Sequence, residues 1–226
     1  MKKRRIFRNL NDKEFAWVLY DVGNSAYTML ACALIPIWFK AMAIGTKPGQ
    51  LTSDRATAYY SMAIAVITIV VALLGPVCGA ISDYKGMKKI FFTSTVAVGV
   101  CGCILNGFAC QWIVFLLLFA ATKIFYNMSL MFYDSMLNDI TTEERMDEVS
   151  SYGYAWGYLG SCIPFLIALV AYVLGPDMAG IISGSLSMAI GFAVTGLWWL
   201  LVTVPLIKNY KHISIKNLSI EFGHIH

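Results

Sequence analysis

The chain has 226 residues, of which 58% are apolar, 14% are aromatic and only 13% are charged, with a net charge of +4. Soluble domains average about 25% charged residues, and a water-soluble fold could not bury this much apolar surface. The composition therefore excludes an ordinary soluble domain and indicates a chain that is embedded in a lipid bilayer.

Six apolar segments are each long enough to cross the ~30 Å hydrocarbon core of a bilayer as a helix. Lipid offers the backbone no hydrogen-bond partners, so each segment is predicted to be helical. In chain order they are residues 17–44, 57–81, 90–109, 111–134, 152–174 and 182–206. The sequence thus predicts an all-α membrane protein. A six-helix transmembrane bundle would occupy residues 17–207, between a cytoplasmic N-terminal segment (1–16) and a cytoplasmic tail (208–226).

Lysine and arginine residues are distributed unequally between the two ends of the predicted bundle. If the N-terminus is cytoplasmic, 13 of the 17 lie on the cytoplasmic side, whereas Lys40, Lys47 and Arg55 lie on the opposite side. Cytoplasmic loops of membrane proteins carry such an excess of basic residues. We therefore expect a multi-pass protein of the plasma membrane with both termini in the cytoplasm.

The first span contains a carboxylate close to its cytoplasmic end. Asp21 is followed by Asn24 and Ser25, which lie on the same helical face. One interpretation is an interfacial carboxylate near a helix N-terminus, where the helix dipole favours a negative charge. The other is a proton-binding or substrate-binding group at the entrance of a polar cavity. The sequence leaves both open.

The connection between the second and third spans combines two glycines, an acidic residue and basic residues. Its characteristic residues are Gly79, Asp83, Gly86 and Lys88. This pattern predicts a tight, charged turn between two helices. An ordinary basic turn on the cytoplasmic side is the alternative interpretation.

The fourth span carries a lysine near its middle. At this depth Lys123 costs roughly 2.5–3.5 kcal/mol on insertion scales, so such a residue normally faces a polar cavity or an opposite charge. Asn127 and Asp134 lie on the same helical face. We predict that this polar stripe lines a substrate or ion path; a buried ion pair that holds two helices together is the alternative. The third and sixth spans lack charged side chains and are expected to face lipid.

The fifth span has a stripe of small residues. Gly153, Gly157 and Gly160 recur at a spacing that places them on one face and allows another helix to approach closely. Pro164 follows them and can bend the helix, because it interrupts the backbone hydrogen bonds. We expect these four residues to act mainly in helix packing.

These motifs resemble the major facilitator superfamily. The turn at residues 79–89 resembles the loop signature between the second and third helices of that superfamily, although Tyr84 and Met87 stand where the signature usually has basic residues. The runs 19–27, 132–140 and 152–160 look like the vacuole-effluxer-like branch, which is related to the autophagy-associated vacuolar amino-acid effluxers of fungi. The resemblance covers residues 15 to about 207.

This resemblance implies a secondary transporter of small polar solutes, with amino acids as candidates and a proton as the most plausible coupling ion. Full-length members have two six-helix halves with the solute site between them, so the chain is expected to supply the N-terminal half. The second half would come from the same gene, a separate chain or a second copy. The substrate or ion path is assigned to Asp21, Asn24, Ser25, Lys123, Asn127 and Asp134, and the gating turn to Gly79, Asp83, Gly86 and Lys88.

A non-transporting scaffold, or a truncated regulatory remnant of a transporter, is the alternative function. It would act through residues 139–148, which contain five acidic residues and one arginine and could dock a basic partner. Enzymatic activity is not predicted, because no span contains histidine and the G-x-S-x-G nucleophile turn is missing. The sequence also lacks a G-x-x-x-x-G-K-[ST] nucleotide loop. We expect no organic cofactor, no metal site and no nucleic-acid partner.

Overall fold

The computed structural model describes residues 9–82, 84, 86–176 and 178–210. This part of the chain is an all-α bundle, as predicted, with one isolated bridge between Ile44 and Leu51. A short 3₁₀ helix, η2, occupies Glu143–Arg145. The α-helices are α1 (Asp12–Ala33), α2 (Ile35–Ala43), α3 (Ser53–Ser82), α4 (Met87–Asn106), α5 (Trp112–Ile140), α6 (Met146–Val173) and α7 (Gly184–Asn209).

Five helices of the described chain, α3 to α7, are each long and apolar enough to span a membrane. The first predicted span consists of two helices, α1 and α2, which are bent by 40° at a short break and together meet the same criterion. Pro36 accounts for the break, because proline has no backbone N–H and disfavours a helical conformation in the residue before it. The six predicted spans are therefore present, the first of them in two pieces.

The largest extensions beyond the spans that hydropathy predicted are at the end of α5 and the start of α6. The fourth span was expected to end at residue 134, but α5 continues to Ile140; the fifth was expected to begin at residue 152, but α6 begins at Met146. Both extensions contain polar and charged residues, and a helix can continue past the hydrocarbon core with such side chains. As a consequence, Asp134 lies inside α5 rather than at its end.

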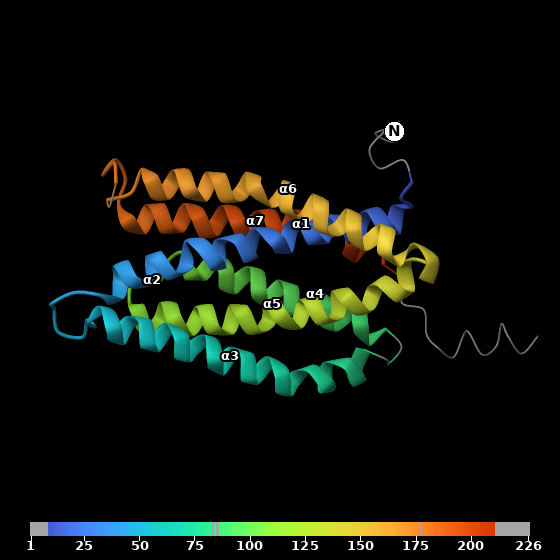
Figure 1. Cartoon of the computed structure of the whole chain (residues 1–226), viewed down its shortest axis with the longest axis horizontal. Coiled ribbons are helices and arrows are strands. Elements are labelled where there is room, and N and C mark those ends of the chain that lie inside the picture. Colours follow the sequence, from blue (N-terminus) through green and yellow to red (C-terminus); the bar gives the residue numbers. More distant parts are fainter. Residues whose placement is uncertain (1–8, 83, 85, 177, 211–226) are drawn as a thin grey trace, which may run out of the picture.

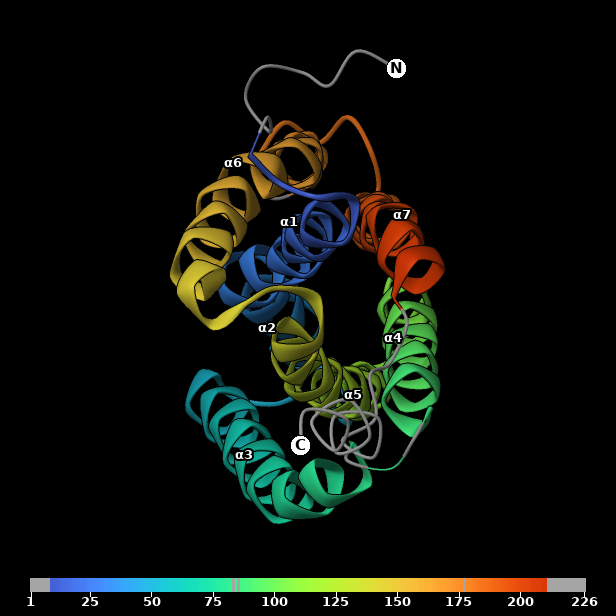
Figure 2. The ribbon, with the colours of Figure 1, turned by 90° about the vertical axis from the view of Figure 1, so that its right-hand side faces the viewer.

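The helices lie side by side along the long axis of the molecule (Figure 1). Viewed from one end, α1 is flanked by α6 and α7, α5 lies beside α4, and α3 lies at the edge (Figure 2). The start of α1, the end of α5 and the start of α6 lie at the same end of the bundle. This arrangement brings α1, α5 and α6 together there.

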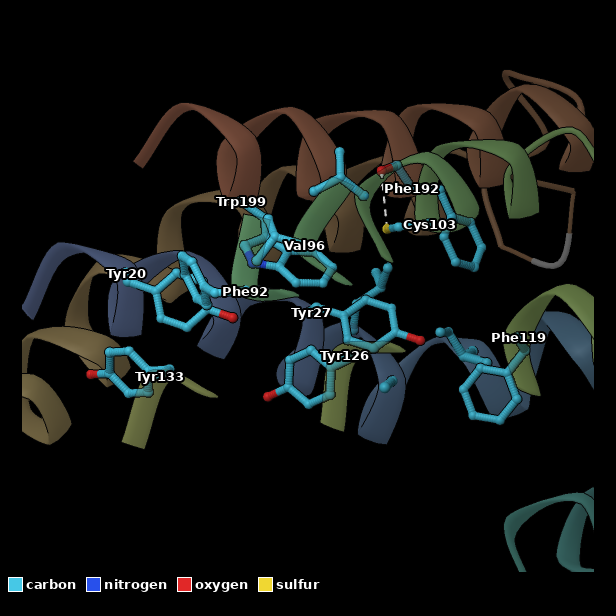
Figure 3. Packing of buried hydrophobic residues seen from close by; sticks show 14 of the residues in the cluster. Tyr20, Tyr27, Phe92, Val96, Cys103, Phe119, Tyr126, Tyr133, Phe192 and Trp199 are labelled. Atoms are coloured by element: carbon cyan, nitrogen blue, oxygen red, sulfur yellow. Dashed lines mark hydrogen bonds between the residues drawn. The ribbon is translucent and has the colours of Figure 1, made fainter. Parts of the chain in front are cut away.

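An aromatic cluster joins four helices at the centre of the bundle (Figure 3). The ring of Tyr27 in α1 lies 4.9 Å from that of Tyr126 in α5, measured between centroids, and both lie 5.7 Å from the Trp199 ring in α7. Gly99 of α4 provides space for this tryptophan, because a Cβ atom at that position would lie 2.7 Å from its Cη2 atom. Aromatic burial of this kind fixes the relative positions of α1, α4, α5 and α7.

The expectation that the third and sixth spans face lipid stays a prediction, although both helices also pack within the bundle. In the most apolar stretches of α4 and α7, 39% of the residues are buried, compared with 11% in α3, the second span. The uncharged helices pack through small residues: Gly196 of α7 approaches Ile104 of α4 so closely that a Cβ atom there would lie 2.6 Å from Cγ1. A helix without charge can be buried in protein as readily as in lipid.

Candidate functional site

A cavity of about 310 Å³ lies between α1, α5 and α6. Four of the six residues that we assigned to the substrate or ion path line it, namely Asp21, Asn24, Ser25 and Asp134. The other described lining residues are Trp17, Thr28, Met29, Leu130, Tyr133, Leu137, Ser150, Tyr154 and Tyr158. The structure therefore brings the polar faces of the first and fourth spans together, and α6 closes the cavity on a third side.

The α1 side of the cavity is an ordered polar surface. Asn24 is buried, and its side-chain amide donates a hydrogen bond of 3.1 Å to Oδ1 of Asp21. Asp21 itself is half-buried. The hydrogen bond holds one carboxylate oxygen of Asp21 in place, and the other oxygen faces α6.

The glycine stripe of α6 faces these α1 side chains. A Cβ atom at Gly157 would lie 3.0 Å from both Oδ2 of Asp21 and Oγ of Ser25, and one at Gly153 would lie 2.9 Å from the Trp17 ring. Further along α6, Gly160 packs against Val22 and Pro164 is buried within the helix. The glycines thus allow close approach of α1 and α6, and they also provide the space that Asp21 occupies.

Trp17 and Tyr133 form an aromatic wall of the cavity. Their rings are stacked with centroids 4.3 Å apart, and the indole Nε1 of Trp17 donates a hydrogen bond of 3.1 Å to the Tyr133 carbonyl. The Tyr133 hydroxyl is buried and has no hydrogen-bond partner among the described residues. Sequence reasoning missed both residues, although Trp17 precedes Asp21 by one helical turn and Tyr133 is adjacent to Asp134.

Asp134 provides the second carboxyl group of the cavity. Its side chain is exposed and forms no hydrogen bond or ion pair with the described residues. Among the described residues that line the cavity, none is lysine, arginine or histidine. The cavity is consequently acidic, and its two like charges favour the approach of a positive charge.

Lys123 and Asn127 do not line this cavity. Lys123 is half-buried, and its Nζ atom lies 4.5 Å from the centroid of the Tyr126 ring and 5.6 Å from that of Tyr27. Aromatic faces stabilise a cation at such distances. The predicted stripe from Lys123 to Asp134 therefore divides into two environments, one aromatic and one acidic. Within the described chain Lys123 forms no ion pair, so the alternative of a buried ion pair at Lys123 is not observed either.

The turn between α3 and α4 is fixed to the rest of the bundle. Gly86 precedes α4 with a φ of 79°, a left-handed conformation that favours glycine, whereas Gly79 faces open space. Asp83, also assigned to this turn, lies outside the described residues.

Lys88 is buried and forms an ion pair of 2.9 Å with Asp139 at the end of α5. The Lys88 ammonium also donates to the Ser135 carbonyl, and Asp139 accepts a hydrogen bond from the Tyr210 hydroxyl.

Together, the apolar helices define an integral, multi-pass α-helical membrane protein. The comparison with known proteins indicates which class of membrane protein the chain resembles. It is 35% identical over 207 residues to an uncharacterised MFS-type transporter, YxiO, of Bacillus subtilis. The alignment covers 90% of this chain and 48% of the relative, so the chain spans about half the length of that protein. The similarity supports membrane transport and a relationship to the major facilitator superfamily. No family model matches the chain, and no solved structure matches it.

Proposed function

We propose that this chain is the N-terminal six-helix half of a major facilitator transporter that moves a small polar solute across the plasma membrane. The solute would be an amino acid or a related amine, as in the vacuole-effluxer-like branch that the sequence resembles. In this proposal both termini are cytoplasmic, a proton gradient is the source of energy, and transport proceeds by rocking of the two halves against each other.

The acidic cavity is the observation that carries this proposal. An ionisable side chain inside a membrane helix is costly unless it faces a polar cavity or a partner. Asp21 and Asp134 share one cavity, whose described lining lacks a basic residue. A structural ion pair does not account for these two carboxylates, whereas a path for a polar solute does.

A second half would also cover an apolar surface of this chain. In α3, the side chains of Ile69 and Leu73 are 59% and 71% exposed, and α3 lies at the edge of the bundle (Figure 2). The length of the relative, about twice that of the matched segment, is consistent with a second half of similar size. The partner would be encoded in the same gene, supplied by a separate chain or provided by a second copy.

The scaffold alternative is not favoured. It requires the acidic segment at residues 139–148 to present its charges to a partner. Asp139 is instead paired with Lys88, and Arg145 lies 3.2 Å from Glu14 and 3.8 Å from Glu148. Part of the charge of this segment is thus used to hold the ends of the helices together.

Uptake into proteoliposomes tests the proposed function. The chain is assayed alone and in a chimera in which it replaces the matching segment of the Bacillus subtilis relative, with panels of amino acids, amines and sugars. We expect saturable uptake of at least one solute. Asp21→Asn and Asp134→Asn should each reduce it by about tenfold or more, because the loss of a charged contact costs about 1.5–3 kcal/mol.

Asp54→Asn is the matched control, because Asp54 is exposed in the first turn of α3 and lies outside the cavity. This variant should transport at the wild-type rate. If neither the chain nor the chimera takes up any solute above empty liposomes, the proposed function is wrong. If uptake is found but both cavity variants retain it in full, the path does not pass through this cavity.

A further inference from the structure

The charge of the cavity restricts which solutes can bind in it. Two carboxyl groups, those of Asp21 and Asp134, face the same space of about 310 Å³. The described lining offers no basic side chain, and Lys123 is held against the rings of Tyr27 and Tyr126 outside it. Within the described lining, an anionic group on a solute would therefore meet two carboxylates and no cation.

Two tyrosines of α6 provide a second, independent argument. Tyr154 and Tyr158 line the cavity, and they are 68% and 69% exposed. The faces of such rings attract ammonium groups. The rings of Trp17 and Tyr133 are buried and stacked on each other, so they close the cavity and are less available to a solute.

From this geometry we infer that the cavity binds a small solute with a net positive charge, whose ammonium group lies between Asp21 and Asp134. The inference rests on the proposed function and narrows its substrate class. Amines and basic amino acids fit it. A neutral amino acid also has an ammonium group, but its carboxylate would lie in the same acidic space and lower its affinity.

The volume of the cavity is consistent with a small organic cation as the solute. Cavities that bind small molecules enclose about 300–1,000 Å³, so a space of about 310 Å³ suits a single small organic cation rather than a peptide. Ser25 and Asn24 supply neutral polar groups on the α1 side. They can accept hydrogen bonds from the ammonium group without adding charge.

Calorimetric binding to the chain in phosphatidylcholine nanodiscs tests the inference, with empty nanodiscs as the blank. Four probes share a phenethyl group and differ in charge: phenethylammonium is a cation, phenylalanine a zwitterion, 2-phenylethanol neutral and 3-phenylpropionate an anion. We expect phenethylammonium to bind with a Kd about tenfold or more below that of the other three, a difference of about 1.4 kcal/mol.

Variants locate the binding site. Asp21→Asn and Asp134→Asn should each raise the Kd of phenethylammonium by about tenfold or more, whereas Asp54→Asn should leave it unchanged. Equal affinity for phenylalanine or 2-phenylethanol overturns the inference, and so does the absence of binding by all four probes. The comparison among probes uses the unmodified chain, so a variant that fails to fold does not decide the result.

The outcomes separate this inference from the proposed function. Tight binding of phenethylammonium together with no uptake of any solute by the chimera supports the cation site and contradicts transport. Uptake of a neutral or anionic solute that depends on Asp21 supports transport and overturns the cation site.

Discussion

Replacing Lys88 by methionine is expected to lower the free energy of unfolding by about 3–5 kcal/mol, the largest effect on stability that we predict for a single substitution. The side chains of Lys88 and Asp139 are only 8% and 12% exposed, and their charged atoms lie 2.9 Å apart. Methionine keeps the length of the side chain but removes its charge. The Asp139 carboxylate would then remain buried without this cation, which is the costly part of breaking such a pair.

Reversible unfolding in mixed detergent micelles measures this effect. The double variant Lys88→Met with Asp139→Leu should recover most of the lost stability, because replacing both partners by apolar groups leaves no unpaired charge. Lys40→Met is the matched control: Lys40 is exposed in the last turn of α2, and its loss should change stability by less than about 0.5 kcal/mol. Equal stability of Lys88→Met and Lys40→Met would show that the ion pair does not hold the turn to α5.

Gly157→Leu is expected to abolish binding and transport and to destabilise the chain by about 1–3 kcal/mol. The Cβ atom alone would lie 3.0 Å from Oδ2 of Asp21 and from Oγ of Ser25. The remaining atoms of leucine would occupy the cavity or push α1 away from α6. Binding of phenethylammonium and uptake by the chimera report the functional loss, and the micelle unfolding assay reports the stability.

Ala97→Leu is the matched control for this substitution. Ala97 also lies within a helix, α4, but its side chain is exposed and does not line the cavity. Leucine is a strong helix former, so this variant should bind and transport like the wild type and should not lose stability. If Gly157→Leu behaves in the same way as Ala97→Leu, the close approach of α6 to Asp21 does not shape the site.

The number of spans and the polar faces of the first span were predictable from sequence because they depend on local patterns. Hydropathy identifies a segment that must cross lipid, and helical spacing places Asp21, Asn24 and Ser25 on one face. The turn at Gly86 was predictable for a similar reason, because the left-handed backbone conformation of this tight turn favours glycine.

The neighbours of each face could not be predicted in this way. The helical spacing of Lys123 and Asp134 is the same in the sequence and in the structure, but Lys123 meets tyrosine rings and Asp134 meets the cavity. Which helix lies opposite a residue depends on tertiary packing, here on the glycine stripe of α6 and on the aromatic cluster around Trp199. The ion pair of Lys88 with Asp139 was missed for the same reason, because these residues are 51 positions apart.

The central claim is that the Asp21–Asp134 cavity is a water-filled part of the solute path, and the accessibility of Ser25 tests it most directly. In a background without the six native cysteines, the rate at which Ser25→Cys reacts with thiol reagents of opposite charge is measured. Thr195→Cys is the control, because Thr195 is wholly buried in α7. We predict that Ser25→Cys reacts with a trimethylammonium reagent, reacts more slowly with a sulfonate reagent of similar size, and is protected by phenethylammonium. A Ser25→Cys variant that is as unreactive as Thr195→Cys toward both reagents would contradict the claim.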